Sequence, residues 1–355
     1  MTSPGQRHAT LRAIAQSAGV DVSTVSRVLN GSPEQAQRAA SRQTAEHIRQ
    51  WAARLNYRPN PHATSLRTRR SDQIGVLVPH LTDFVLATVY EGIEDAAARH
   101  GKTTFVMNSH DQPTKQRERT ELALSRRVDG LIFGDAHTDA AFLDELAAQQ
   151  IPFVLVNRHA GDHPAITCDD YQGGRLVAEH FLQLGHTRVA VIAGEPFAST
   201  GIDRTTGFCD RYHQAGINVP PSHIIHSHFD ATGGRTATDH LLHTHTHTRP
   251  TAIFAVNDFA AIGALGALRD QNLRPGHDIA IAGYNDTPLA AQLPIPLTSV
   301  RSPMHTMGAH SLELLLQVLA GQPAPSKRLT PELVIRASTD PAQRSGTITG
   351  LRPDG

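Results

Sequence analysis

The chain has 355 residues, and its 33 Lys and Arg residues balance its 33 Asp and Glu residues to a formal net charge of zero. This length suits two or three domains, and two cysteines are too few for a disulfide scaffold. No apolar run approaches the ~18 residues of a membrane span, and no apolar signal segment opens the chain, so we expect a cytoplasmic protein without membrane partners.

Residues 10–30 predict two short helices joined by a tight turn. Leucine, isoleucine and alanine recur with the spacing of an amphipathic helix at Leu11, Ile14, Ala15 and Ala18. Gly19 suits the turn, and Asp21 is a good N-cap for a second helix over 22–29. The outer face of this second helix carries small or hydrogen-bonding side chains and one guanidinium. Two such helices form a helix-turn-helix, which sets its second helix in the major groove of DNA.

The charge distribution favours DNA binding over a generic helical hairpin. Residues 1–70 hold 11 Arg, no Lys and 3 acidic residues, a balance of 11 − 3 = +8. The remaining residues carry 33 − 11 = 22 basic and 33 − 3 = 30 acidic groups, a balance of −8. A basic head on an acidic body is typical of a nucleic-acid-binding module attached to another domain.

The chain after the helix pair predicts one more helix and a hinge. Gly31-Ser-Pro interrupts the chain, and a helix starting near Ser41 is expected to bury Ile48, Trp51, Ala52 and Leu55. Pro61, with Asn60 as its cap, suits a short helix that ends before Ser71. Two turns are not stable alone in water, so residues 57–70 are expected to order only when something holds them.

From Ile74 onwards, short apolar runs alternate with helical segments. The predicted strands are 74–78, 103–106, 130–133, 153–156, 189–192, 252–256 and 278–282. Predicted helices include 86–99, 138–149, 172–184, 257–269 and 304–319, and left-handed C-caps are expected at Gly101, Gly185 and Gly321. Repeated β-α units predict two parallel-sheet subdomains, with a ligand site where the carboxyl ends of their strands meet. Cys168 and Cys209 are interpreted as small hydrophobic residues, and the tail after Thr339 is expected to be disordered.

The ordered motifs closely resemble the lactose-repressor (LacI/GalR) family of bacterial transcription factors. In the head they are Thr10-Leu…Ile14-Ala…Ala18-Gly-Val…Thr24-Val-Ser-Arg-Val-Leu-Asn-Gly31, Leu55-Asn-Tyr-Arg-Pro-Asn60 and Ala63…Ser65-Leu66. In the body they include Val256-Asn-Asp258, Ala282-Gly-Tyr-Asn-Asp286 and Val334-Ile-Arg-Ala-Ser338. The resemblance covers roughly residues 10–340. It implies a helix-turn-helix headpiece on an α/β core like that of periplasmic sugar-binding proteins, and a repressor associated with the nucleoid.

The resemblance also implies which residues contact near-palindromic operator DNA. Val22, Ser23 and Arg27 would face base edges. Arginine recognises guanine well because its guanidinium donates hydrogen bonds to O6 and N7 together. The hinge residue Leu66, with Ala63 beside it, would wedge into the minor groove and kink the duplex. The remaining predicted DNA contacts, several of them to phosphates, are Thr10, Leu11, Thr24, Ser26, Asn30 and Asn60.

A small effector, expected to be a sugar or related polyhydroxy metabolite, would bind in the cleft of the body. The residues that the resemblance assigns to it are His80, Phe84, Asn157, Arg158, Arg204, Phe229, Asn257, Asp258 and Asn285. Amides, a carboxylate and a guanidinium around aromatic rings suit the hydroxyls and apolar faces of a sugar or nucleoside.

The chain departs from the family pattern at several positions. About five additional residues lie between Pro33 and Ser41, and Trp51 and Asp21 stand where alanine and serine are common. Thr64 occupies a place often held by arginine, and Asn285 replaces a frequent aspartate of the effector site. None of these departures removes a predicted base-reading or wedge residue.

Other functions find less support. His243, His245 and His247 alternate as metal ligands on a strand would, but no Cys, Asp or Glu nearby completes a shell, which favours an exposed connector. Gly263 and Gly266 lack the third glycine of a dinucleotide site and are interpreted as close-packing positions. No catalytic residue, cofactor or metal is predicted. An enzyme or carrier on a sugar-binding core, with an incidental basic head, is the alternative.

The predicted organisation follows from these assignments. Residues 1–59 form the DNA-binding domain, 60–70 the hinge, 71–340 the effector-binding and dimerisation core, and 341–355 a tail. Within the core, the N-subdomain comprises about 71–169 and 301–328, and the C-subdomain about 170–300 and 329–340. A homodimer is expected because two heads must reach the half-sites of a palindrome, and the tail has no leucine heptads with which to build a tetramer.

Overall fold

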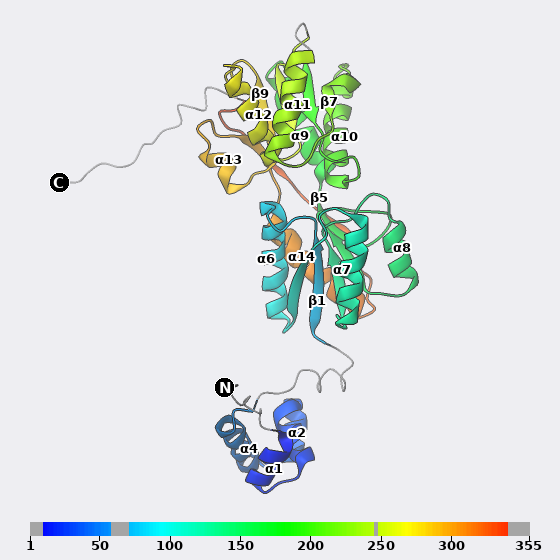
Figure 1. Cartoon of the computed structure of the whole chain (residues 1–355), viewed down its shortest axis with the longest axis vertical. Helices are drawn as coiled ribbons and strands as arrows, with labels where there is room; N and C mark the ends of the chain where they lie inside the picture. The colour runs from blue at the N-terminus through cyan, green and yellow to red at the C-terminus, as the bar shows by residue number, and fades with distance from the viewer. Residues whose placement is uncertain (1–9, 58–70, 245–247, 340–355) are drawn as a thin grey trace, which may run out of the picture. The chain divides into compact units, whose positions relative to one another are not determined.

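The computed structural model describes residues 10–57, 71–244 and 248–339. The chain divides into two compact units between Asp72 and Gln73 (Figure 1). In the described parts, no helix is long and apolar enough to cross a membrane. The predicted hinge and the tail after Thr339 fall almost wholly outside the described residues.

The first unit is helical and has one apolar core. Its helices are α1 (Leu11–Ala18), α2 (Val22–Asn30), α3 (Pro33–Ala39) and α4 (Arg42–Arg54). Ile14, Val25 and Ile48 from three of these helices are fully buried against one another. Gly19 takes a φ of +67° between α1 and α2, as the turn requires. The predicted helix-turn-helix is confirmed.

The sequence predicts no helix between Gly31 and Ser41, whereas Pro33–Ala39 form α3. Ser32 Oγ accepts a hydrogen bond from the Gln35 amide at 3.2 Å, and Gln35 Oε1 accepts one from the Ser32 amide at 3.2 Å. Pro33 occupies the first turn, where its missing N–H costs nothing. Residues 33–39, within the stretch predicted to be longer than the family pattern, thus form a capped helix.

Trp51 is half-buried, although the sequence predicts it to be buried. Its Nε1 donates to His47 Nε2 at 3.2 Å, and the Arg54 guanidinium lies 5.3 Å from its ring centroid. Ile48 and Ala52 on the same helix are buried as predicted. The indole thus covers the edge of the core and keeps its polar nitrogen paired.

The second unit contains two six-stranded sheets. The first sheet has the order β11-β5-β4-β3-β1-β2 and all its pairs are parallel. Its strands are β1 (Gln73–Val78), β2 (Thr103–Asn108), β3 (Gly130–Phe133), β4 (Phe153–Val156), β5 (Ala165–Cys168) and β11 (Lys327–Leu329). Helices α6 (Phe84–Arg99) and α14 (Met304–Leu319) cover one face, and α7 (Pro113–Ser125) and α8 (Ala141–Ala148) cover the other.

The second sheet has the order β12-β10-β9-β8-β6-β7, and only its β10–β12 pair is antiparallel. Its strands are β6 (Val189–Ile192), β7 (Ile224–Ile225), β8 (Ala252–Ala255), β9 (Ala280–Asn285), β10 (Thr298–Arg301) and β12 (Glu332–Val334). Helices α9 (Asp170–Gln183) and α10 (Ser199–Gln214) cover one face, and α11 (Ala231–Thr244) and α12 (Asp258–Asp270) cover the other. The short α13 (Pro288–Gln292) and a 3₁₀ turn (Pro221–His223) complete this lobe.

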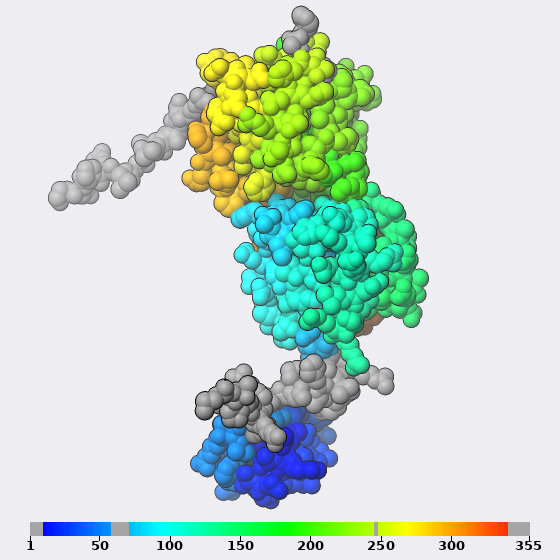
Figure 2. Space-filling view, viewed as in Figure 1, coloured from blue at the N-terminus to red at the C-terminus, as the bar shows by residue number. Residues whose placement is uncertain are grey.

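The chain passes between the two lobes three times, after β5, after β10 and after β11. Figure 2 shows the lobes in contact, with the cyan and green atoms of the first against the green and yellow atoms of the second. The predicted α/β class with two sheets is confirmed, whereas the exact subdomain boundaries stay a prediction.

Several elements differ from the sequence prediction. The prediction omitted the short strands β5, β7, β10, β11 and β12 and the helices α3, α7, α10 and α13. Strand β9 begins at Ala280, two residues after the predicted strand. Gly101, Gly185 and Gly321 have the positive φ angles expected of them. A Cβ on Gly263 would lie 2.0 Å from the Ala231 carbonyl oxygen, whereas one on Gly266 would meet nothing closer than 3.4 Å, so only Gly263 is a close-packing position.

Candidate functional site

The exposed face of α2 carries the predicted base-reading residues. Val22, Ser23 and Arg27 are exposed, and Val22 keeps 38% of its surface accessible although it is apolar. The Asp21 carboxylate accepts a hydrogen bond from the Ser23 amide at 2.7 Å, which caps the helix. Hydrogen bonds from Ser23 lower the pKa of Asp21. The first turn of α2 is therefore capped, while the side chains of Val22 and Ser23 stay accessible.

The other predicted DNA contacts have mixed surroundings. Thr10 is exposed and its Oγ1 accepts from the Ala13 amide at 3.3 Å, so it caps α1. Leu11 is half-buried against the apolar core of the head. Asn30 Nδ2 donates to the Tyr57 hydroxyl at 3.5 Å, which links the end of α2 to the residues after α4. Two further predicted contacts, Thr24 and Ser26, are half-buried on α2. The last three, Asn60, Ala63 and Leu66, lie outside the described residues.

Two cavities lie where the two lobes of the body meet. The outer one has a volume of about 510 Å³ and includes His80 and Phe229 from the predicted set. The inner one has a volume of about 30 Å³ and is lined by Asn157, Arg158, Arg204, Phe229, Asn257 and Asn285, all of them predicted. Asp83 and Phe229 line both cavities, so we treat the two as one cleft. The structure thus brings seven of the nine predicted effector residues together.

Phe84 and Asp258 line neither cavity. Phe84 is the first residue of α6 and is 38% exposed. Asp258 is fully buried, and its Oδ2 accepts hydrogen bonds from the Thr287 amide at 2.7 Å and hydroxyl at 3.0 Å. Its Oδ1 accepts from the Ser299 hydroxyl at 2.5 Å, and burial raises its pKa to about 6. Asp258 therefore positions the loop after β9, and its burial outside both cavities keeps it from a ligand.

The inner cavity contains a buried amide oxygen that no described residue satisfies. Asn285 is 4% exposed, and its Oδ1 has no hydrogen-bond partner. Its φ of 104° is unusual for a residue with a side chain, and such backbone strain gathers at ligand sites. Asn157 follows β4 with a φ of 66° and lines the same cavity. A buried polar atom without a partner is costly, so the geometry favours a hydroxyl or amine donor supplied from outside.

Both arginines of the cleft are already neutralised by carboxylates of the protein. Arg204 is 3% exposed; its Nε donates to Asp170 at 2.8 Å and its Nη1 donates to the Val256 carbonyl at 2.7 Å. Its guanidinium also lies 3.7 Å from the centroid of the Tyr284 ring. Arg158 donates to both oxygens of Asp111, at 2.6 and 3.0 Å. Burial opposes ionisation of Asp111, but hydrogen bonds from His137 and Arg158 prevail and lower its pKa to about 2.

Several contacts cross directly between the lobes beside the cleft. The Thr138 amide donates to the Phe197 carbonyl at 2.9 Å, and the rings of His137 and Phe197 stack with their centroids 4.2 Å apart. The Ser199 hydroxyl accepts from the His159 amide at 2.9 Å. His159 Nε2 lies 2.8 Å from Asp203, and this carboxylate raises the pKa of His159. The contacts between the two lobes therefore lie directly beside the cleft.

Sequence reasoning missed several residues that line the cleft. They are Thr82, Asp83, Val85, Leu86, His110, Asp111, Glu195, Phe197, Thr200, His228, Asp230 and Phe259. Asp111 follows the end of β2, and Glu195 and Phe197 follow the end of β6. The rule that ligands bind beyond the carboxyl ends of parallel strands points to these loops. In the described ranges, no group of three or more His, Cys, Asp and Glu residues is arranged to hold a metal ion.

Comparisons with known proteins agree with this geometry. The family of bacterial regulatory proteins called lacI matches residues 10–60, and a periplasmic binding protein-like domain matches residues 178–339. The transcriptional regulator DegA of Bacillus subtilis is 30% identical over 94% of this chain and 98% of its own. The regulator GalS of Salmonella typhimurium is 33% identical over 88% of this chain and 90% of its own. The transcriptional repressor PurR of Aliivibrio fischeri is 29% identical over 93% of this chain and 98% of its own.

Solved structures show the same arrangement of elements. The lac repressor dimer bound to operator and the anti-inducer ONPF has a TM-score of 0.85 and 28% identity, covering 94% of this chain and 100% of the repressor chain. The complex of the transcriptional regulator CelR with cellobiose has a TM-score of 0.71 and 26% identity, covering 93% and 99%. These relatives are regulators of transcription and not enzymes.

Proposed function

Since the chain belongs to the LacI family of DNA-binding transcriptional regulators, we propose that it is a dimeric repressor controlled by a small polyhydroxy metabolite. The operator is a near-palindrome, and the effector is a sugar or a related compound that binds in the cleft between the lobes. The unsatisfied Oδ1 of buried Asn285 is the observation that carries the effector assignment, because a ligand hydroxyl would complete it.

The DNA-binding half of the proposal rests on the first turn of α2. Val22 and Ser23 are exposed there, and Arg27 is exposed in the last turn of the same capped helix, so all three side chains can reach base edges. Arg27 is the one guanidinium of α2, and a bidentate pair with guanine discriminates against other bases by about 1–3 kcal/mol. The +8 balance of residues 1–70 would supply the salt-dependent attraction to phosphates.

The effector half rests on where the cleft lies. Asn157 and Asn285 come from different lobes and line the inner cavity. Beside it, Phe197 stacks on His137, and the His159 amide donates to Ser199, from one lobe to the other. A ligand that touches both lobes has different contacts in each relative arrangement of them, and it therefore shifts their equilibrium. Residues 60–70, the proposed hinge between the units, would transmit that shift to the two heads. The assignment of residues 71–340 as the effector and dimerisation core follows from the same proposal.

The DNA half is tested by selecting genomic fragments with the purified full-length protein and measuring operator affinity by gel shift. A near-palindromic consensus, bound at least a thousandfold more tightly than random DNA, is expected. Light scattering at micromolar concentration should give twice the mass of the 38.4 kDa chain. Failure to prefer any DNA fragment would refute the proposed role as a sequence-specific regulator. A tetramer, or a monomer that binds the palindrome tightly, would refute the proposed dimer.

The effector half is tested by a thermal-shift screen of sugars and nucleosides. A compound that stabilises the protein is then added to the operator complex. Release of DNA identifies an inducer and tighter binding identifies a corepressor. A compound that binds the cleft but leaves operator affinity unchanged contradicts the proposed control.

A further inference from the structure

The charges of the cleft are unsuited to an anionic ligand. Arg204 is paired with Asp170 and Arg158 with Asp111, and no other Lys or Arg is among the described residues that line the two cavities. The outer cavity adds the carboxylates of Asp83, Glu195 and Asp230. A phosphate or carboxylate in this cleft would meet like charges and no unpaired cation.

The sizes of the two cavities indicate a ligand that enters the inner one only by its end. A volume of about 30 Å³ exceeds the ~10–15 Å³ that one water molecule needs but is far too small for a sugar ring, so the inner cavity has room for a hydroxyl-bearing end of a ligand. The outer cavity of about 510 Å³ falls within the ~300–1,000 Å³ typical of ligand pockets. Most of the ligand therefore lies in the outer cavity.

The outer cavity offers aromatic surfaces to that ligand. Phe197, Phe229 and Phe259 come from three separate segments of the second lobe, and all of them line it. Phe259 lines the outer cavity without reaching the inner one. Flat apolar rings beside carboxylates and imidazoles suit sugar rings, which have apolar faces and hydroxyl edges.

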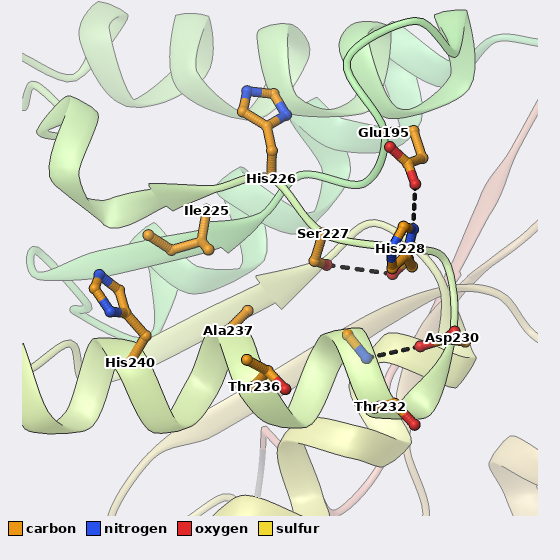
Figure 3. Close-up of a pocket in the computed structure, with 11 residues that line it drawn as sticks. Glu195, Ile225, His226, Ser227, His228, Asp230, Thr232, Thr236, Ala237 and His240 are labelled. Carbon is orange, nitrogen blue, oxygen red and sulfur yellow. Dashed lines mark hydrogen bonds and ion pairs between the residues drawn. The ribbon is translucent and has the colours of Figure 1, made fainter.

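A third cavity borders the outer one. It has a volume of about 610 Å³ and shares Glu195, His228 and Asp230 with the outer cavity. Figure 3 shows its two walls, the segment of Ile225 to His228 on one side and Thr236 and His240 of α11 on the other. Glu195 is hydrogen-bonded to the His228 ring at the border. The remaining lining is rich in hydrogen-bonding groups, namely His226, Ser227, Thr232, Thr236 and His240.

We propose that the effector is an uncharged oligosaccharide and not a monosaccharide, a sugar phosphate or a nucleobase. Its terminal sugar places a hydroxyl at Asn285, the next unit lies against Phe259 in the outer cavity, and a third unit passes the Glu195–His228 pair into the third cavity. This inference rests on the proposed function of the cleft as the effector site. It adds the size and charge of the ligand and assigns a role to the third cavity.

Isothermal titration calorimetry on the full-length protein tests the proposal. The probes are the cello-, xylo- and malto-oligosaccharide series from monosaccharide to tetrasaccharide, with glucose 6-phosphate and hypoxanthine as comparators. In at least one series we expect the Kd to fall at least tenfold, or about 1.4 kcal/mol, from monosaccharide to trisaccharide. The two comparators should not bind.

Matched variants locate the outer sugar units. His240→Ala should weaken trisaccharide binding about fivefold and leave the disaccharide unchanged, because only the third cavity includes His240. His243→Ala is the control, since His243 is exposed on the same helix and lines none of the three cavities. Phe259→Ala should weaken the disaccharide more than the monosaccharide. A thermal melt of each variant verifies that it is folded.

The outcomes separate this inference from the proposed function. Three results would refute the oligosaccharide as the ligand without affecting the proposal that the protein binds an operator. They are a Kd that does not depend on oligosaccharide length, tighter binding of glucose 6-phosphate or hypoxanthine, and no binding of any oligosaccharide. An oligosaccharide that binds with the expected length dependence but leaves operator affinity unchanged would support the ligand and refute its role as effector. Equal effects of His240→Ala and His243→Ala would refute the use of the third cavity.

Discussion

Arg204→Ala should destabilise the body strongly, because it breaks a buried ion pair from one side. Arg204 and Asp170 are 3% and 4% exposed, and they are joined by a 2.8 Å hydrogen bond. Removing the guanidinium leaves the Asp170 carboxylate buried without its counter-charge and the Val256 carbonyl without its donor. Breaking one partner of such a pair costs about 3–5 kcal/mol. We expect a loss of this size in the free energy of unfolding at pH 8.

The loss should depend on pH in a direction that the burial of Asp170 decides. Burial raises the pKa of Asp170 and the attraction of Arg204 opposes that rise, so the pKa rises further in the variant. A carboxyl whose pKa is higher folded than unfolded (about 3.9) is stabilising when protonated, and that stability is lost as the pH rises through the folded-state pKa. The deficit of Arg204→Ala should therefore be smaller at pH 5 than at pH 8.

Urea unfolding followed by circular dichroism at pH 5 and pH 8 measures both quantities. The double variant Arg204→Ala/Asp170→Asn is the matched control, because it removes the stranded charge, and it should recover more than half of the loss at pH 8. A deficit below 1 kcal/mol at pH 8, or the same deficit at both pH values, would refute the ion-pair reasoning. Effector binding is then compared at the pH where the single variant is folded. There we expect that the effector no longer raises the melting temperature of the variant. An unchanged Kd for the effector would refute the assignment of Arg204 to the effector site.

Three further predictions concern the head, the hinge and the packing of the body. Arg27→Ala should lower the preference for operator over random DNA by about 1–3 kcal/mol in gel shifts, whereas Arg38→Ala, exposed on α3, should not; equal losses would contradict base reading. Leu66→Ala should reduce DNA bending and specific affinity with effector binding unchanged, and a circular-permutation assay that gives the wild-type angle would count against the wedge. Gly263→Ala should lower the melting temperature because its Cβ would meet backbone at 2.0 Å, while Gly266→Ala on the same helix should stabilise by about 0.5–1 kcal/mol; the reverse order in a thermal melt would disprove the close packing.

The head could be predicted almost to the residue because its signals are local. The apolar spacing of α1 and α2, the glycine between them and the Asp21 cap all lie within a few residues of what they determine. The omission of α3 has an equally local cause. Proline was taken as an interruption, although with Ser32 before it and Gln35 two positions later it belongs to a capping box.

The body was predictable where a buried strand is a run of apolar residues, and unpredictable where a strand is very short or mixes polar residues into the run, as the interior strands β5 and β10 do. Strands β3, β4, β6 and β8 are fully buried, so their apolar runs stand out from the chain. The edge strands β7, β11 and β12 have two or three residues each, which is too short for a pattern. Helix α7 buries only Gln116, Thr120 and Ala123, so it has almost no apolar stripe to recognise.

The effector site marks the limit of sequence reasoning, because a polar residue in the right loop is available to a ligand only if the fold has not already used it. Asp258 and Asn285 both follow or end strands of the second sheet, and both were predicted as ligands. Asp258 is fully buried and accepts hydrogen bonds from Thr287 and Ser299, which are 29 and 41 residues away in sequence, whereas the Asn285 oxygen lines a cavity and has no partner. The pairing of Arg204 with Asp170 over 34 residues likewise removes its charge from the cleft. Tertiary packing thus makes the hydrogen bonds that decide whether a residue can bind the effector or only supports the structure. Once these hydrogen bonds are assigned, the cleft is best suited to a neutral, hydroxyl-bearing molecule.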